Sequence, residues 1–465
     1  MGSKGDFSLK VRNKEVVAAM LPMQGHFLPL SNLDLLLPPN DVGVFFCYKK
    51  PIAREGDSSL TLKFLSMVSV LKKALAQTLV SYYAFAGEMV QNTAGEPELL
   101  CNNRGVDFFE AFADVELRDL NLYNPDDSVQ GKLVPKKEQG VLCVQATELR
   151  CGGLVVACAF DHRVADAYSA NMFLVSWAHV AYQSDPVSLF PSFRRSLLSP
   201  RRPGSYHPSL HHMYVPVSLI PPPKLVNLQS NQLISRIYYI KSDQLSCLQS
   251  RASGGHMGKR RTKLEAFSAL LWKMVASTEV ERNRVCTMGI VVDGRMRLSD
   301  RDISSMSSYF GNVLSIPFGK ERAGELMERP LSWVAETVHD FLQAVVTKEH
   351  FLDLIDYVEA HRPTPVLAKI YATGGGEDDG PAFVVSSGLR FPASKVDFGW
   401  GEPAFGSYHF PWGGQAGYVM PMPSPLGNGD WVVYMHLLKG QLEVIEAQAT
   451  YLLQPFTSDY PNYSR

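Results

Sequence analysis

The chain lacks the paired cysteines of a disulfide framework or a zinc site. Its seven cysteines are scattered over 465 residues, and no two of them form a CxxC pair. An odd number of isolated cysteines is typical of free thiols in a reducing compartment. We therefore expect a cytoplasmic protein with no structural metal.

A targeting signal and a long apolar run are also missing. The N-terminus reads MGSKGDFSLKVRNKEVVAAM, without the basic start and apolar core of a signal peptide. The longest strongly apolar stretch, Leu154–Phe160, is far shorter than the roughly 20 residues that a membrane-spanning helix needs. Lys plus Arg number 45 and Asp plus Glu number 46, so the formal charge is only −1. We expect neither a membrane nor a nucleic acid as partner.

The common nucleophile and metalloenzyme motifs are absent as well. No GxSxG elbow occurs, which argues against an α/β-hydrolase. No HExxH motif occurs, so a zinc protease is equally disfavoured. Any catalysis by this chain must therefore use another arrangement of side chains.

What the sequence contains is an ordinary globular composition, 46% hydrophobic and 20% charged. Apolar residues recur with helical spacing over 62–83 and 262–276. Strand-like apolar runs occupy Val42–Tyr48, Val141–Thr147, Leu154–Phe160, Arg236–Ile240 and Trp431–Leu437. Because strands and helices intermingle in both halves, we predict a mixed α/β (α+β) fold of layered sheets covered by helices.

A proline-rich segment divides the chain. Residues 184–224 hold nine prolines, ending in Pro221-Pro222-Pro223. Proline at this density cannot continue helices or central strands. We predict an N-terminal domain over 1–183, a crossover linker over 184–224 and a C-terminal domain over 225–465.

The most informative segment runs from residue 154 to residue 167. Its continuous apolar part predicts a strand buried on both faces, which ends at Asp161 and His162. His162 is thus expected just past the strand, where ligand crevices form in open α/β sheets. It could act as a base, but a hydrogen-bonded structural histidine fits the same pattern. The four-residue spacing to Asp166 could put both on one helix face, as a base with its orienting carboxylate. A metal site would need a third ligand, which the sequence does not supply.

Two motifs resemble those of a known family. His162-Arg163-Val164-Ala165-Asp166 resembles the HxxxD motif of the plant BAHD acyl-CoA-dependent acyltransferases, and Asp397-Phe398-Gly399-Trp400-Gly401 matches their DFGWG motif. Further similar segments are Ser31–Asp34, Leu71–Leu75, Phe85–Gly87 and Tyr309–Asn312. Val16–Pro22 and Leu28–Pro51 most resemble the branch that acylates coniferyl alcohol.

The resemblance implies a two-domain, chloramphenicol-acetyltransferase-like fold with a channel between the domains. Part of the C-terminal domain would return to the N-terminal sheet. It implies a monomeric O-acyltransferase that binds no cofactor and uses acyl-CoA as co-substrate, with the donor and an alcohol acceptor entering from opposite faces.

The resemblance also implies roles for single residues. His162 would be the general base that takes the alcohol's proton as it attacks the thioester, without a covalent acyl-enzyme. Asp166 would be structural, paired with Arg295. The residues Asp397, Gly399, Trp400 and Gly401 would form a structural turn.

Substrate contacts follow from the same resemblance. Thr262 and Lys263 end the basic run 259–263 before a predicted helix, a favourable place for the phosphates of CoA. The acceptor pocket would include Asn40, Phe45, Ser386 and Gly388.

Acceptor choice depends on two departures from the family pattern. Relatives that use shikimate-type acceptors carry Trp where this chain has Gly388, and tend to carry His where it has Asn40. The pocket is then more open and less polar, which suits an aromatic or phenylpropanoid alcohol such as coniferyl alcohol. Two alternatives stay open: an N-acyltransferase acting on an amine or polyamine, with Asp41 as a candidate carboxylate, and a non-catalytic CoA-binding relative.

Overall fold

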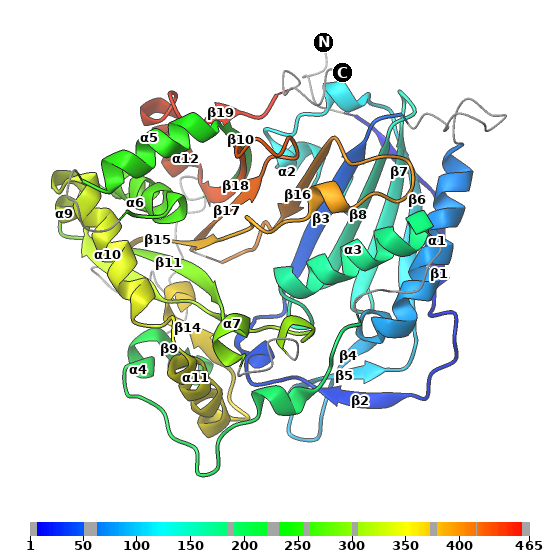
Figure 1. The fold of residues 1–465 in the computed structure, drawn as a ribbon, viewed down its shortest axis with the longest axis horizontal. Helices are drawn as coiled ribbons and strands as arrows, with labels where there is room; N and C mark the ends of the chain where they lie inside the picture. The colour runs from blue at the N-terminus through cyan, green and yellow to red at the C-terminus, as the bar shows by residue number, and fades with distance from the viewer. Residues whose placement is uncertain are drawn as a thin grey trace.

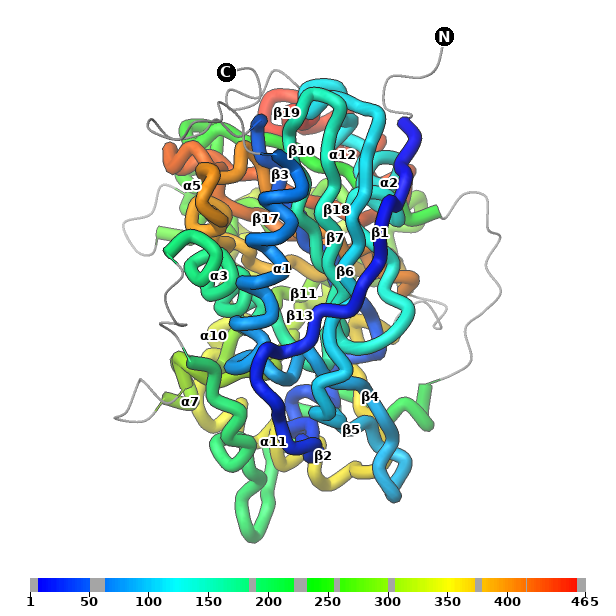
Figure 2. Tube along the Cα trace, turned by 90° about the vertical axis from the view of Figure 1, so that its right-hand side faces the viewer, coloured from blue at the N-terminus to red at the C-terminus, as the bar shows by residue number. Residues whose placement is uncertain are grey.

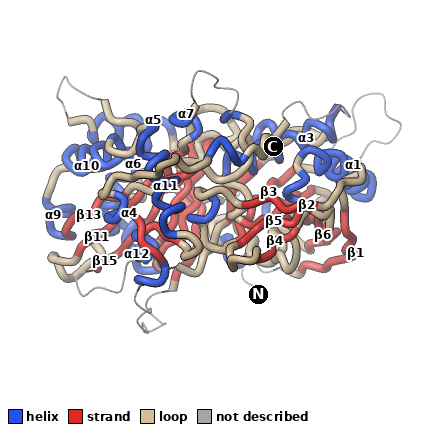
Figure 3. Tube along the Cα trace, turned by 90° about the horizontal axis from the view of Figure 1, so that it is seen from below, coloured by secondary structure: helices blue, strands red, loops and turns tan. Residues whose placement is uncertain are grey.

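The computed structural model describes residues 7–50, 63–183, 190–220, 232–254, 260–299, 306–372, 379–414 and 416–457. Within this part of the chain, two halves lie side by side, each with a sheet as its centre (Figure 1). Several helices of both halves lie on one side of the sheets (Figure 3). The predicted mixed α/β fold of layered sheets and helices is confirmed.

The first half is built on a six-stranded sheet in the order β1-β6-β7-β8-β3-β16. The strands are β1 (Leu9–Val17), β3 (Asp41–Tyr48), β6 (Val106–Ala113), β7 (Leu142–Leu149), β8 (Leu154–Asp161) and β16 (Phe405–His409). Figure 2 shows β1 at the outer edge, beside β6. The helices of this half are α1 (Phe64–Ser81), α2 (Pro125–Ser128) and α3 (Ala167–Gln183). A small sheet contains β2 (His26–Pro29), β4 (Glu88–Gln91) and β5 (Pro97–Cys101).

The second half is built on a sheet in the order β12-β11-β15-β17-β18-β10-β19, with β13 paired to β11. The strands are β10 (Leu233–Ile240), β11 (Val285–Asp293), β12 (Leu314–Ser315), β13 (Phe318–Arg322), β15 (Asp379–Ser386), β17 (Gly417–Pro423), β18 (Trp431–Leu438) and β19 (Gln454–Pro455). The helices are α5 (Ser242–Ala252), α6 (Lys263–Ala276), α7 (Arg295–Leu298), α9 (Ala323–Glu328), α10 (Leu331–Gln343), α11 (Lys348–His361) and α12 (Lys439–Gln448). A small antiparallel sheet pairs β9 (Tyr214–Pro216), next to α4 (Leu210–Met213), with β14 (Val366–Ala368).

The sequence patterns explain these elements. The five predicted strands correspond to β3, β7, β8, β10 and β18, and the two predicted helices correspond to α1 and α6. In α1, Leu71, Leu75 and Leu79 form one fully buried stripe. Burial of each such side chain contributes about 2 kcal/mol. By length and composition α1 could span a membrane, but this stripe packs in the protein core.

Strand β8 lies in the middle of the first sheet, between β7 and β3, and all eight of its residues are buried. This position explains its continuous apolar sequence, since neither face meets water. The pairing of Asp41 with Asp161 places the start of β3 beside the residue that follows β8, which is His162.

The C-terminal half contributes one strand to the first sheet. Strand β16 pairs with β3, with His409 opposite Gly43. The chain therefore crosses back before it continues into β17 of the second sheet. The limits 1–183, 184–224 and 225–465 stay a prediction, and residues 184–189 and 221–231 lie outside the described part of the chain.

Candidate active site

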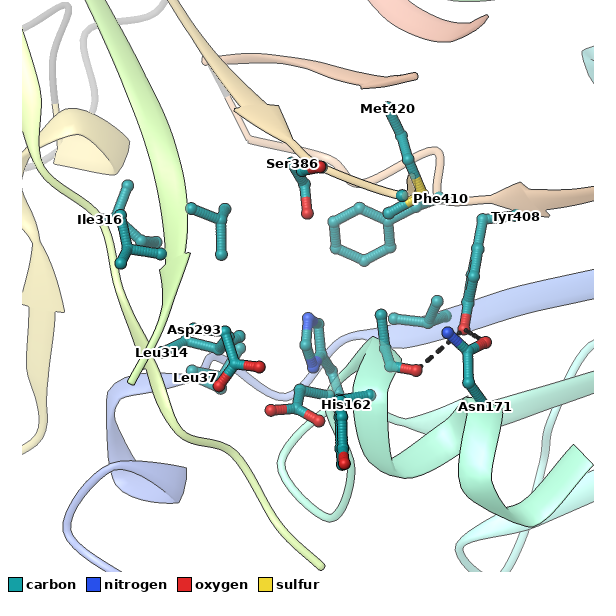
Figure 4. A pocket seen from close by; sticks show the side chains of 18 of the residues that line it. Leu37, His162, Asn171, Asp293, Leu314, Ile316, Ser386, Tyr408, Phe410 and Met420 are labelled. Atoms are coloured by element: carbon teal, nitrogen blue, oxygen red, sulfur yellow. Dashed lines mark hydrogen bonds between the residues drawn. The ribbon is translucent and has the colours of Figure 1, made fainter. Parts of the chain in front are cut away.

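A cavity of about 580 Å³ is lined by residues of both halves. Strands β3 and β8 and helix α3 of the first half line it, together with β11, α7 and β17 of the second half. Its volume is in the range of small-molecule sites, and most of its wall is apolar. The labelled polar side chains on this wall are His162, Asn171, Asp293, Ser386 and Tyr408 (Figure 4).

His162 follows β8 directly and projects into this cavity (Figure 4). Its Nδ1 lies 3.2 Å from the carbonyl oxygen of Ala165. Because a carbonyl only accepts hydrogen bonds, Nδ1 carries the proton and Nε2 keeps a free lone pair. Burial lowers the pKa of His162, which keeps the ring neutral near pH 7. The residue therefore has the tautomer and charge of a general base.

This electrostatic state predicts the pH dependence of turnover. Since only the neutral imidazole accepts a proton, kcat/KM should be constant at neutral pH and fall as the pH drops. The lowered pKa of His162 places the midpoint of this fall below pH 6.5, the value of an unperturbed histidine. A midpoint above pH 6.5 in a pH–rate profile of the intact enzyme would contradict the assignment.

Asp166 is engaged by Arg295. The Arg295 guanidinium donates from Nη1 to Asp166 Oδ2 at 2.7 Å and from Nη2 to Oδ1 at 3.1 Å. Asp166 Oδ1 also accepts from the Ser169 backbone N–H at 2.9 Å, which caps the start of α3. The two side chains that the resemblance pairs are thus brought together across the two halves.

The shared helix face for His162 and Asp166 was a wrong prediction. Helix α3 begins only at Ala167, so residues 162–166 form a turn. No hydrogen bond joins Asp166 to the His162 ring among the described residues, and both carboxylate oxygens are held by Arg295. An aspartate directly before a helix accepts hydrogen bonds from the free N–H groups of the first helical turn. This position is more favourable for an aspartate side chain than the interior of a helix.

A buried polar chain holds the backbone of the His162 turn. Asn312 donates from Nδ2 to the carbonyl oxygen of His162 at 2.9 Å and to Asp34 Oδ1 at 2.9 Å. The other oxygen of Asp34 accepts from Ser31 at 2.7 Å. On the other side, the His162 N–H donates to the carbonyl of Asn40 at 2.9 Å. Sequence analysis noted 31–34 and 309–312 only as similar segments and did not predict this contact.

We expect Asn312→Ala to lower kcat by about 10- to 100-fold with little change in KM. The variant releases the backbone of the catalytic turn, and misplacement of a catalytic group by about 1 Å can cost 10²-fold. Steady-state kinetics measures the effect, and Asn102→Ala, which loses a side-chain bond to Glu88 at an exposed site, is the matched control. Unchanged kcat in folded Asn312→Ala would rule out the positioning role.

The DFGWG segment forms a turn away from the cavity. Asp397 Oδ1 accepts from the N–H groups of Gly399 at 2.8 Å and of Gly401 at 2.9 Å. Both glycines have positive φ, 110° and 107°, which side-chain-bearing residues rarely adopt. The Trp400 ring stacks on Phe398, with centroids 5.6 Å apart. None of these residues lines the cavity, which agrees with the structural role that the resemblance implies.

Three of the four acceptor-pocket residues line the cavity, namely Asn40, Ser386 and Gly388. The prediction for Phe45 was wrong: it is fully buried, with its ring 5.7 Å from that of Phe405. Side chains alternate along a strand, and Val42 of β3 is the one that lines the cavity, so Phe45 faces the opposite side.

Gly388 is closely packed by strand β17. A Cβ atom at this position would lie 2.7 Å from Cγ of Met422, 2.9 Å from Cγ of Met420 and 3.0 Å from the carbonyl oxygen of Pro421. Met420 lines the cavity. The methionines of β17 therefore occupy the space that a larger residue at position 388 would need.

The candidate amine-binding carboxylate does not line the cavity. Asp41 forms an ion pair with Lys137 at 3.1 Å instead. The carboxylates on the cavity wall are Asp166 and Asp293. Asp293 ends β11, and its Oδ1 accepts from the Arg295 N–H at 2.9 Å. Sequence analysis did not single it out, although a charged residue at the end of an apolar strand was a signal for it.

The two predicted CoA-binding residues lie at the start of α6. Thr262 Oγ1 accepts from the Glu265 N–H at 3.1 Å, and the Glu265 carboxylate accepts from the Thr262 N–H at 2.6 Å, which forms a capping box. Neither Thr262 nor Lys263 lines the cavity. A contact with CoA stays a prediction, and Lys259 lies outside the described residues. Among the described residues, no group of three or more His, Cys, Asp or Glu side chains could hold a metal ion.

Two sheet-based halves with a neutral histidine in the cavity between them form a chloramphenicol-acetyltransferase-like fold. The Transferase family matches residues 7–452, and the chain belongs to this family, the BAHD acyltransferases. It is an acyl-transferring enzyme that uses a CoA thioester as co-substrate.

Curated relatives match most of the chain, and solved structures share its fold. The chain is 27% identical over 438 residues to putrescine hydroxycinnamoyltransferase 3 of Oryza sativa subsp. japonica, covering 90% of this chain and 92% of that protein. It is 27% identical over 395 residues to shikimate O-hydroxycinnamoyltransferase of Nicotiana tabacum, covering 81% and 86%. Vinorine synthase has a similar fold, with a TM-score of 0.66 and 18% identity, and the match covers 96% of this chain and 99% of that one. F. graminearum TRI101 complexed with coenzyme A and deoxynivalenol also has a similar fold, with a TM-score of 0.72 and 14% identity. The match covers 92% of this chain and 99% of that one.

Proposed function

We propose that the protein transfers an acyl group from acyl-CoA to the hydroxyl of an aromatic or phenylpropanoid alcohol, such as coniferyl alcohol. The single observation that carries this proposal is His162, neutral and with a free Nε2, in a largely apolar cavity. A neutral alcohol is a poor nucleophile, so its proton must leave as the new bond forms, and Nε2 is placed to take it.

The reaction balances without a covalent enzyme intermediate. The acceptor oxygen attacks the thioester carbonyl while Nε2 of His162 takes the hydroxyl proton. The tetrahedral intermediate then collapses to the ester and expels the CoA thiolate, which receives the proton from the imidazolium. The carbonyl of Ala165 accepts from Nδ1, and the negative charges of Asp166 and Asp161 favour the protonated ring, so both stabilise the imidazolium while it exists. Binding of both substrates in one cavity supplies the proximity.

The cavity wall supports an aromatic acceptor. The Phe410 ring meets the His162 ring edge-on, with centroids 6.0 Å apart. Further apolar residues on the wall are Leu36, Leu37, Phe160, Phe391, Trp412 and Met420. A flat ring buries its faces well against such side chains, while its hydroxyl reaches the histidine.

One observation favours a second candidate, an N-acyltransferase acting on an amine or polyamine. The Asp293 carboxylate lies on the cavity wall and could receive an ammonium group. A relative that this chain resembles is named a putrescine hydroxycinnamoyltransferase. Against it, Asp293 is already in contact with Arg295, whose Nη1 lies 3.3 Å from Oδ1.

Release of the free CoA thiol tests the proposal. Acetyl-, benzoyl-, p-coumaroyl- and feruloyl-CoA would each be combined with coniferyl alcohol, shikimate and spermidine. We expect release that depends on coniferyl alcohol or a related aromatic alcohol. Release with spermidine alone would establish the amine reaction instead, and CoA binding without release in any combination would favour a non-catalytic relative.

A further inference from the structure

The cavity wall carries three cationic side chains that no described side chain neutralises. Arg297 lies on α7, and Arg390 and Lys395 lie in the segment that follows β15. All three side chains line the cavity and are exposed. None of them forms an ion pair or a hydrogen bond with another described residue. Three long cations that remain unpaired at a solvent-accessible wall are available to a ligand.

Tyr168 on helix α3 interacts with one residue from each of the two segments that carry these cations. The guanidinium of Arg295, at the start of α7, lies 4.4 Å above the ring of Tyr168 on α3. Burial raises the pKa of the Tyr168 hydroxyl, and the positive charges of Arg295 and Arg390 partly offset this rise. The Tyr168 hydroxyl itself donates to the carbonyl of Ser307 at 2.8 Å. Arg295 of α7 and Arg390 of the segment after β15 therefore both act on this ring of the cavity wall.

The balance of charge on the cavity wall is also positive. Its cationic side chains are Arg295, Arg297, Arg390 and Lys395, and its carboxylates are Asp166 and Asp293. Both carboxylates contact Arg295, which leaves a surplus of two positive charges in a chain with a formal charge of −1. The wall contributed by residues 36–38, 314 and 316 is apolar. Like charges on the wall of a low-dielectric cavity concentrate their field on an incoming anion.

We propose that Arg297, Arg390 and Lys395 form an anion-binding part of the cavity wall that holds an oxyanion group of one substrate. The group is the diphosphate of acyl-CoA or a carboxylate on the acceptor. Guanidinium groups bind both with paired, charge-assisted hydrogen bonds. This assignment rests on the proposed function and differs from the contact predicted at Thr262 and Lys263, which do not line the cavity.

The test compares substrates with and without the anion. Arg297→Ala, Arg390→Ala and the double variant would be assayed with acyl-CoA and with the matching acyl-pantetheine thioester, which lacks the phosphates. We expect the KM for acyl-CoA to rise about 3- to 10-fold for each arginine removed. The KM for acyl-pantetheine should not change, and added salt should weaken acyl-CoA binding less in the variants than in the unchanged protein.

Two further variants serve as controls. Arg390→Lys should recover part of the affinity for acyl-CoA that Arg390→Ala loses. Arg118→Ala, which removes an exposed cation paired with Glu116 outside the cavity, is the control.

Each outcome has a defined meaning. If both thioesters keep their KM but a carboxylate-bearing acceptor loses affinity relative to its methyl ester, the site exists and the acceptor supplies the anion. If no KM moves by more than twofold in the double variant, the site is rejected. If the unchanged protein has no turnover, the proposed function fails independently. In that case calorimetry tests whether the anion-binding site exists. The site is rejected if the double variant and the unchanged protein bind CoA equally well and also bind a carboxylate-bearing alcohol equally well.

Discussion

Replacement of His162 by alanine is expected to lower kcat by about 10²- to 10⁴-fold, the usual contribution of a general base. The ring is neutral, its Nδ1 is held by Ala165, and its Nε2 is the free basic nitrogen of the residue. Affinity for CoA should change little, because the substitution removes the base and not the walls of the cavity. Initial rates of CoA thiol release, combined with CoA titration by calorimetry, measure the two quantities separately.

The matched control for this prediction is His212→Ala. His212 is an exposed histidine on α4 that does not line the cavity, and its replacement should leave kcat unchanged. If His162→Ala retains more than a tenth of the turnover, another group must remove the proton. A loss of CoA affinity together with turnover would instead indicate a collapsed cavity.

Loss of the Asp166–Arg295 pair should destabilise the protein strongly. The two side chains are 1% and 3% exposed, and their contact joins the turn after β8 to α7 of the other half. Removal of one partner leaves an uncompensated buried charge, which costs about 3–5 kcal/mol. We expect Asp166→Ala and Arg295→Ala to unfold at much lower urea concentration. Arg282→Ala, which breaks an ion pair with Glu328 whose two side chains are 67% and 64% exposed, should cost at most about 1 kcal/mol.

The same variants separate a structural role of Asp166 from a charge-relay role. If Asp166 is structural, Asp166→Asn keeps one oxygen that can accept from Arg295 or from the first turn of α3. Stability and turnover should then both fall, and each only in part. In a charge relay, Asp166→Asn would lower kcat by orders of magnitude in a protein as stable as the original. That second result would contradict the geometry, in which both carboxylate oxygens serve Arg295.

The sequence predicted those parts of the fold that depend on a short continuous pattern. Strand β8 is apolar from Leu154 to Phe160 and ends at Asp161, directly before His162, so both the strand and the place of the histidine followed from local sequence. The apolar stripe of α1 predicted a helix in the same way. Such patterns are local because burial on one or both faces acts on neighbouring residues directly.

Other features could not be predicted because they depend on residues far apart in the chain. Strand β3 is almost continuously apolar, so nothing local indicates that Val42 and not Phe45 lines the cavity. The contact of Asn312 with the His162 carbonyl spans 150 residues. The cations of the cavity wall come from two separate segments and meet only through the tertiary fold.

The central claim is that His162 transfers the acceptor's proton while the acyl group passes directly from CoA to the acceptor. The most direct measurement mixes purified protein with acyl-CoA, with and without an aromatic alcohol, and follows thiol release, ester formation and intact protein mass together. We expect one thiol released for each ester formed, no release without acceptor, no gain in protein mass, and loss of both products in His162→Ala. A stoichiometric thiol burst without acceptor, accompanied by an acylated protein, would contradict it.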